Sequence, residues 1–235
     1  MRRRMEEREE GRQDFFTISI SDLMASLLAI FMLTICYFIL NFSQATAQLT
    51  QNDVTRAELL MRIHEQLAQD GIKVTIDEQH GILRISEGVL FDVGTAEVKP
   101  KGRRVIHKLG VILTDVLQSD EFAGTVETIF IEGHTDDVPI NSPDFPSNWE
   151  LSTKRAINTW RLMVAGSPLL DQLKNESRQP IFSCSGYAET RPIADNADAE
   201  GRRANRRIDI RFTMTPPGED DMSIVKFVHR KMSDE

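Results

Sequence analysis

The chain has 235 residues, of which 40% are hydrophobic, and a formal net charge of −8. This length allows one folded domain of ordinary size together with an anchor or linker. The acidic balance argues against a nucleic acid as partner, because binding to phosphates requires an excess of lysine and arginine. With only two cysteines, we expect the folded domain to depend on its apolar core.

A long apolar stretch lies near the N-terminus. Between Phe15 and Phe42 the only side chain expected to carry a charge is Asp22. About 20 apolar residues suffice for a helix to cross the hydrocarbon of a bilayer. A cleaved signal peptide is the alternative, but its apolar region has only about 7–15 residues and ends at a small-residue cleavage site. We therefore predict a retained transmembrane helix over residues 15–42.

The charges around this stretch predict its orientation. Residues 43–52, which follow it, carry no charge. Five arginines precede it: Arg2, Arg3, Arg4, Arg8 and Arg12. Basic residues favour the cytoplasmic side, so we expect the N-terminus in the cytoplasm and the rest of the chain in the periplasm of a Gram-negative cell. The membrane would then separate Cys36 from Cys184 and prevent an intrachain disulfide.

Beyond the apolar stretch, the spacing of apolar residues predicts alternating helices and strands. The predicted helices cover residues 53–71, 103–117 and 148–166. The predicted strands cover residues 72–76, 81–86, 127–133, 180–186 and 206–214, the first two forming a hairpin. This order predicts an α+β fold, an α/β sandwich in which helices cover one face of a mixed sheet, preceded by a single transmembrane helix.

These observations divide the chain into five parts. In chain order they are a cytoplasmic basic tail (1–14), the transmembrane helix (15–42), a periplasmic linker helix (43–71), a folded domain (72–215) and a C-terminal tail (216–235). We find no internal repeat and no low-complexity tract.

Three blocks of the folded domain resemble a known family. They are "FDVGTAEVKPKG" (91–102), "IEGHTDDVPI" (131–140) with "SNWELSTKRA" (147–156), and "SGYAETRPIADNADAEGRRANRRIDIRF" (185–212). In order and spacing they resemble the OmpA-like peptidoglycan-binding domain. The middle block, the basic N-terminus and the aspartate near the start of the apolar helix also resemble the B subunits of flagellar motor stators (MotB-type).

The residues of the middle block suit a zwitterionic ligand. Peptidoglycan stem peptides carry an ammonium beside a carboxylate at diaminopimelate, which one acidic and one basic side chain can hold. Asp136 follows a predicted strand and Arg155 lies on the next helix, so both can face one groove. The resemblance implies the same pair. We also expect Asn148 and Leu151 to line this face and Thr135, Asn205 and Arg206 to contact the ligand at its rim.

Other interpretations of these residues remain open. Asp136 and Asp137 could be turn or helix caps, and Arg155 could be a solvated surface charge. His134 with Asp136 could suggest a metal, but no third ligand stands at a usable spacing. The arginines of "NRRIDI" could brace the sheet edge. Because no hydrolase pattern stands out, we expect a protein that binds the wall and is not an enzyme.

Asp22 requires an explanation, since a carboxylate inside a membrane is costly. It could cap the helix at the membrane interface. However, Ala25, Ser26 and Ala29 share its helical face, and such small residues let another helix approach closely. The resemblance implies that Asp22 carries an ion, so we expect transported H+ or Na+ and no other cofactor.

One helix cannot enclose an ion path, so a partner is required. The resemblance implies a pentamer of polytopic A subunits around a homodimer of this chain, with peptidoglycan and membrane lipid as further partners. The approach "SISDLMASLLAIF" to the aspartate and the short stretch before the first strand look more like the B subunit of the Zorya anti-phage defence system (ZorB, which works with ZorA). A flagellar stator B subunit and a passive OmpA-like wall anchor are the alternatives.

Overall fold

The computed structural model describes residues 2–216, which divide into two compact units. The first unit ends at Leu49, and the second runs from Thr50 to Pro216. The C-terminal tail predicted from residue 216 lies outside the described residues except for Pro216. The side chains of the basic tail, residues 1–14, also lie outside the described part.

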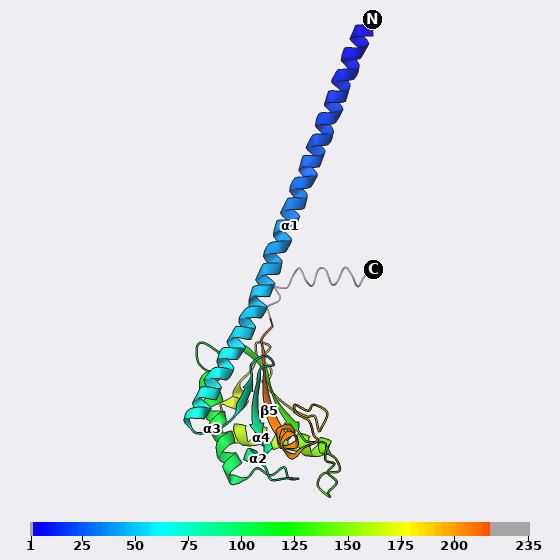
Figure 1. The fold of residues 1–235 in the computed structure, drawn as a ribbon. Helices are drawn as coiled ribbons and strands as arrows, with labels where there is room; N and C mark the ends of the chain where they lie inside the picture. The colour runs from blue at the N-terminus through cyan, green and yellow to red at the C-terminus, as the bar shows by residue number, and fades with distance from the viewer. Residues whose placement is uncertain (1, 217–235) are drawn as a thin grey trace. The chain divides into compact units, whose positions relative to one another are not determined.

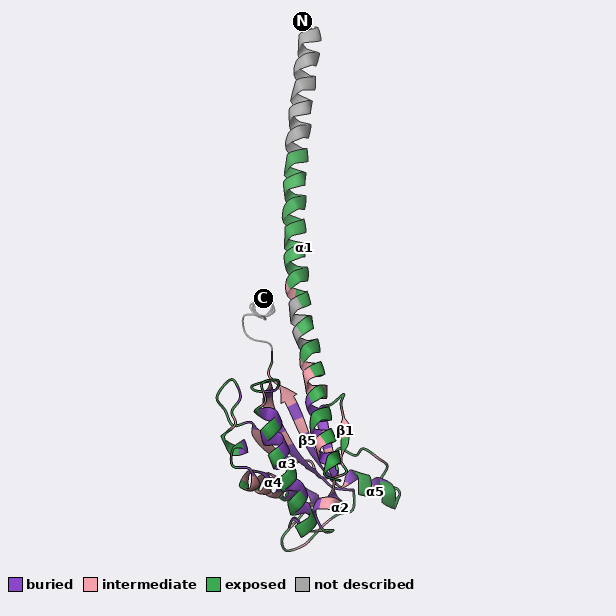
Figure 2. Cartoon of the chain, turned by 90° about the vertical axis from the view of Figure 1, so that its left-hand side faces the viewer, coloured by how far each residue is buried: buried purple, intermediate pink, exposed green. Residues whose placement is uncertain are grey.

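The first unit contains the apolar part of helix α1 (Arg2–Gln69). Residues Ser21–Ser43 have a mean hydropathy of 2.5, and nothing in the structure buries them. Figure 2 shows this stretch as almost entirely exposed. An apolar helix of 23 residues is long enough to cross a bilayer. The described chain therefore has one N-terminal apolar helix that could span a membrane.

Polar side chains within this stretch bond to their own helix. The Ser26 hydroxyl donates to the Asp22 carbonyl oxygen, and the Thr34 hydroxyl donates to the Ile30 carbonyl oxygen, each at 2.8 Å. A polar group without a partner is costly in hydrocarbon, where water cannot satisfy it. These bonds therefore make the two hydroxyls compatible with a lipid environment.

The second unit is built on a mixed sheet that has five strands in the described part of the chain (Figure 1). Their order across the sheet is β1-β2-β5-β3-β4. Only β3 and β4 are parallel, and the other neighbouring pairs are antiparallel. The strands are β1 (Thr75–Asp77), β2 (Ile82–Ser86), β3 (Val126–His134), β4 (Phe182–Gly186) and β5 (Arg207–Met214).

Helices α3 (Pro100–Leu117) and α4 (Asn148–Gly166) pack beside each other against the sheet (Figure 1). Their apolar side chains share one core with the strands, which includes Ile106, Leu109, Leu113, Met163, Ile131, Ile210 and Phe212. Full burial of one such side chain contributes about 1.5–3 kcal/mol. Cys36 and Cys184 are free thiols, so the core holds the unit together without a disulfide between them.

The structure corrects the prediction of a linker helix over residues 43–71. The second unit begins at Thr50, within that range. Four apolar residues of α1 are buried in its core, each at most 1% exposed: Leu59, Leu60, Ile63 and Leu67. Their helical spacing was visible in the sequence, but which surface they would cover was not. The last turns of α1 therefore belong to the folded domain.

Three short helices were not predicted. They are α2 (Glu87–Leu90), α5 (Ala199–Asn205) and the 3-10 helix η1 (Leu170–Gln172). Each is too short for a periodic apolar pattern. Two of them matter for the candidate site, because α2 begins directly after β2 and α5 ends directly before β5.

Helix α4 lies unusually close to strands β3 and β4. A Cβ atom at Gly133 would lie 2.0 Å from the carbonyl oxygen of Ser152 on α4. A Cβ atom at Gly186 would lie 2.5 Å from the backbone nitrogen of Thr153. Both distances are shorter than any real Cβ contact, so a larger residue on either strand would push the helix away.

We predict that Gly133→Ala lowers the free energy of unfolding by about 2–3 kcal/mol, because overpacking against fixed atoms costs about 1–3 kcal/mol. Gly88→Ala is the control, since the nearest atom to its Cβ would be 4.0 Å away. Denaturation followed by tryptophan fluorescence measures both, because Trp149 and Trp160 lie on α4. Equal stability of the two variants would contradict the close approach of the helix.

Candidate ligand-binding pocket

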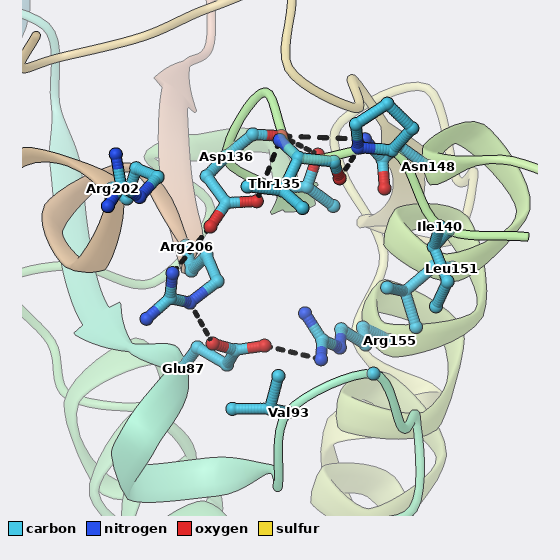
Figure 3. A pocket seen from close by; sticks show the side chains of 13 residues that line it. Glu87, Val93, Thr135, Asp136, Ile140, Asn148, Leu151, Arg155, Arg202 and Arg206 are labelled. Carbon is cyan, nitrogen blue, oxygen red and sulfur yellow. Dashed lines mark hydrogen bonds and ion pairs between the residues drawn. The ribbon is translucent and has the colours of Figure 1, made fainter. Parts of the chain in front are cut away.

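A pocket of about 340 Å³ opens where strand β3 ends, beside helix α4 (Figure 3). Its lining includes Thr135, Asp136, Asn148, Leu151, Arg155 and Arg206. The structure thus brings together all of the predicted site residues of the external domain except Asn205.

Four charged side chains form a row of alternating sign in this pocket (Figure 3). Arg155 pairs with Glu87 at one end. Glu87 Oε2 also accepts a hydrogen bond from Arg206 Nε at 2.6 Å, and Arg206 Nη1 donates to Asp136 Oδ2 at 2.5 Å. Asp136 and Arg155 were expected to act as a pair. In the structure they are linked through Glu87 and Arg206 instead.

Arg155 is a fixed, buried cation. Its side chain is 2% exposed, so the alternative of a solvated surface charge does not apply. Its Nε donates to the Thr95 carbonyl oxygen at 2.7 Å and its Nη2 to the Asp92 carbonyl oxygen at 3.3 Å. Burial lowers the pKa of the guanidinium, and the pairing with Glu87 opposes that change. Arginine stays protonated at physiological pH, so the pocket holds a permanent positive charge.

Asp136 combines a structural contact with a position in the pocket. Its Oδ1 accepts from the Val138 backbone nitrogen at 3.3 Å, which is the turn contact considered as an alternative. Asn148 supports the same turn, because its Nδ2 donates to the Val138 carbonyl oxygen at 3.2 Å. Thr135 is buried, and its hydroxyl donates to the Asp136 carbonyl oxygen at 2.9 Å. These bonds hold the Asp136 carboxylate in place beside Arg206.

Apolar side chains complete the lining. Leu151 is buried one turn before Arg155 on α4. Val93 and Val138 line the pocket and are 80% and 56% exposed. Exposed apolar groups beside a charged interior are typical of a site that takes an amphipathic ligand.

The two arginines that begin the segment "RRIDI" have different surroundings. Arg206 lines the pocket and is tied to Glu87 and Asp136. Arg207 is buried and pairs with Asp209 within β5, with Nε 2.9 Å from Oδ2. Arg207 therefore pairs within the central strand of the sheet and not at its edge, as that alternative had it, whereas Arg206 lines the pocket.

Asn205 is not a rim contact, which corrects the prediction. Its side chain is fully buried and does not line the pocket. Its Oδ1 accepts from the Ile193 and Ala194 backbone nitrogens at 2.7 and 3.0 Å, and its Nδ2 donates to the Ala194 carbonyl oxygen at 2.8 Å. An amide that satisfies this many backbone groups fixes the loop before α5, so its role is structural.

Sequence reasoning missed Glu87 and Arg202, which also line the pocket. The sheet register explains why Glu87 is there. Strand β5 lies between β2 and β3, and Arg207 is the register partner of Ser86 on one side and of His134 on the other. Glu87 directly follows β2, and Asp136 comes two residues after the end of β3. Both therefore lie at the same end of the sheet as Arg206, which directly precedes β5. Nothing in the local sequence around Glu87 indicates this neighbour.

His134 does not support the metal interpretation. It does not line the pocket, and its ring stacks on that of Tyr187 with centroids 5.4 Å apart. Burial lowers the pKa of His134 to about 3, and the nearby charge of Arg207 contributes to this shift. In the described part of the chain, no group of three or more His, Cys, Asp and Glu side chains is placed to hold a metal ion.

Asp22 lies near the start of the apolar stretch Ser21–Ser43 and is exposed on α1. Its backbone carbonyl accepts the hydroxyl of Ser26, which was predicted on the same helical face.

The fold is the mixed α/β fold of OmpA-like domains, preceded by an apolar helix. The model of the OmpA family matches residues 90–206. The cell wall anchor of the T6SS from Pseudomonas aeruginosa has a similar structure, with a TM-score of 0.51 and 25% identity over 66% of this chain and 97% of that one. The predicted OmpA-like fold is confirmed.

Two curated relatives add to this result. Motility protein B from Bacillus subtilis is 36% identical over 125 residues, which are 53% of this chain and 45% of that protein. This chain therefore spans about half the length of that relative. Zorya protein ZorB from Escherichia coli is 23% identical in an alignment of 221 positions that covers 90% of this chain and 83% of that protein. A match of that extent necessarily includes most of the apolar helix.

We predict that Glu87→Ala lowers the free energy of unfolding by about 3 kcal/mol, because removing one partner of a buried ion pair leaves the other charge without compensation. Arg155 would lose its acidic partner. Glu97→Ala is the control, since Glu97 pairs with Arg103 at 3.6 Å on the exposed surface. Denaturation followed by tryptophan fluorescence compares the two. If both variants were as stable as the wild type, the Arg155 charge would have to be solvated.

Proposed function

We propose that the chain is a membrane-anchored B subunit of the motor-stator type, which binds peptidoglycan through its external domain. The observation that carries this proposal is the pocket at the end of β3, where Asp136 and Arg155 lie on an OmpA-like fold. A motility protein and a cell wall anchor among the similar proteins support it. Nothing in their names points to an enzyme, and we propose no catalytic role.

The chemistry of the pocket suits the zwitterionic end of diaminopimelate. Asp136 offers a carboxylate to the ammonium group, and Arg155 offers a guanidinium to the adjacent carboxylate. Because Arg155 is already held by Thr95 and Asp92, little further ordering is needed when a ligand binds. Leu151 provides an apolar contact for the aliphatic part of the same residue.

The apolar helix would anchor the chain in the inner membrane. The arginines before it favour a cytoplasmic N-terminus, which would place the domain in the periplasm. Asp22 would carry H+ or Na+, and no other cofactor is needed. This role would explain a carboxylate at a position where its desolvation is costly.

An ion path requires further helices beside this one. We propose a polytopic A subunit as partner, in a pentamer around two copies of this chain, so that two Asp22 carboxylates face different partner subunits. Peptidoglycan would hold the two copies still while the A subunits turn around them. One charge that crosses 100 mV releases about 2.3 kcal/mol, which could drive each step.

Two systems fit this proposal. Zorya anti-phage defence is favoured by the match with ZorB, which extends over 90% of this chain and includes most of the apolar helix. A flagellar stator is favoured by the higher identity, 36%, with motility protein B, although that match covers 53% of the chain. The genes beside the one for this chain distinguish the two systems.

We predict that Arg155→Lys reduces binding of the full-length chain to isolated peptidoglycan by about 10-fold or more. Lysine keeps the charge but loses the planar fork that binds a carboxylate bidentately, and a hydrogen bond to a charged group is worth about 1.5–3 kcal/mol. Co-sedimentation with purified wall material measures the affinity.

Arg161→Lys is the matched control, because Arg161 lies on the same helix but does not line the pocket. Tryptophan fluorescence establishes that both variants are folded. If folded Arg155→Lys bound the wall as tightly as Arg161→Lys, Arg155 would have no part in binding.

We predict that Asp22→Asn abolishes ion flux while the chain stays in the membrane with its partner. Asparagine keeps the volume of the side chain and loses only the titratable charge. Vesicles from cells that produce the chain with its A subunit, loaded with pH- and Na+-sensitive dyes, measure the flux. Asp53→Asn is the control, since Asp53 lies outside the apolar stretch. Undiminished flux through Asp22→Asn would exclude the carrier role.

A further inference from the structure

The charges that line the pocket do not balance. Glu87 and Asp136 are acidic, whereas Arg155, Arg202 and Arg206 are basic. The two acids and two of the arginines belong to the row of ion pairs described above. Among the described residues, Arg202 forms no ion pair with an acid. The lining therefore carries one more positive charge than its own acids neutralise.

Arg202 is held at the pocket by neutral acceptors. It lies on α5 and is partly buried. Its Nη1 donates to the carbonyl oxygens of Asn196 at 2.6 Å and of Ala197 at 3.2 Å, and these are the hydrogen bonds of its side chain within the described part of the chain. Because both hydrogen bonds use Nη1, the other two nitrogens of the guanidinium, Nε and Nη2, remain available to a ligand. Figure 3 shows Arg202 beyond Arg206, away from Arg155.

A neutral zwitterion would leave this excess charge uncompensated. Glu189 is a further acid that touches the lining, since its carboxylate accepts from Asn148 at 3.1 Å, but Glu189 does not itself line the pocket. A ligand that carries one additional carboxylate would balance the pocket. A carboxylate matches the guanidinium fork, and partial burial reduces the screening of such a contact by water.

We propose that Arg202 binds a second carboxylate of the stem peptide, outside the diaminopimelate zwitterion. This inference rests on the proposed function, because it specifies the ligand of the same pocket. A stem tetrapeptide offers two carboxylates of this kind, the α-carboxylate of D-glutamate and the carboxylate of the C-terminal D-alanine. The pocket would then prefer a stem peptide in which one of these groups is free over one in which it is amidated.

The test measures calorimetric binding of the full-length chain in detergent to three tetrapeptides, L-Ala-γ-D-Glu-meso-diaminopimelate-D-Ala and its versions amidated at either carboxylate. Arg202→Gln should weaken binding of the free peptide by about 10-fold, the effect of losing one charge-assisted hydrogen bond. It should change binding by less than about 2-fold for the version that lacks the carboxylate Arg202 contacts. The amidated peptide whose binding Arg202→Gln does not weaken identifies the carboxylate that Arg202 contacts.

Arg203→Gln is the matched control, because Arg203 is the exposed neighbour on α5 and does not line the pocket. It should bind all three peptides as the wild type does. Equal weakening of all three peptides by Arg202→Gln, or equal effects of the two variants, would overturn the inference. In that case, if Arg155→Lys still weakened binding of the chain to peptidoglycan, the proposed function would stand. A wild-type chain that bound none of the peptides would refute both.

Discussion

Helix α4 approaches strands β3 and β4 so closely that each strand needs a glycine at the contact. Gly133 and Gly186 lie against the backbone of Ser152 and Thr153. Ser152 is fully buried, and its hydroxyl accepts from the Ala188 backbone nitrogen at 3.1 Å, which ties the segment after β4 to the helix. Because α4 carries the pocket's asparagine, leucine and buried arginine, this contact determines how far they stand from the end of β3.

The pocket has the character of a preassembled charged site. Its buried arginine is neutralised by Glu87 and held by backbone carbonyls, so its charge has a partner before any ligand is present. Removing charges from water is costly, and such a row persists only when each member has partners. The charged row therefore has a desolvation cost at this end of the sheet, whereas the apolar core shared by the helices and the strands stabilises the domain.

The two units place their carboxylates in different physical settings. In the domain, the Asp136 carboxylate accepts hydrogen bonds from the Arg206 guanidinium and from the Val138 backbone nitrogen. Asp22 begins an apolar stretch in which the described hydroxyls bond to their own helix. Such a setting lets a carboxylate exchange a proton or a sodium ion only if partner helices shield it from lipid, which is why the proposed role of Asp22 requires an assembly.

The sequence by itself determined the apolar helix, the mixed sheet, the bounds of α4 and the group of side chains at the end of β3. These follow from local periodicity and from motif spacing, which a single chain displays directly. Only the tertiary structure decided that the end of α1 belongs to the core, that Asn205 braces a loop, and that Glu87 stands between the two arginines. Each of these depends on which distant segments become neighbours. The placement of β5 between β2 and β3 is such a long-range result, and no local pattern around Glu87 encodes it.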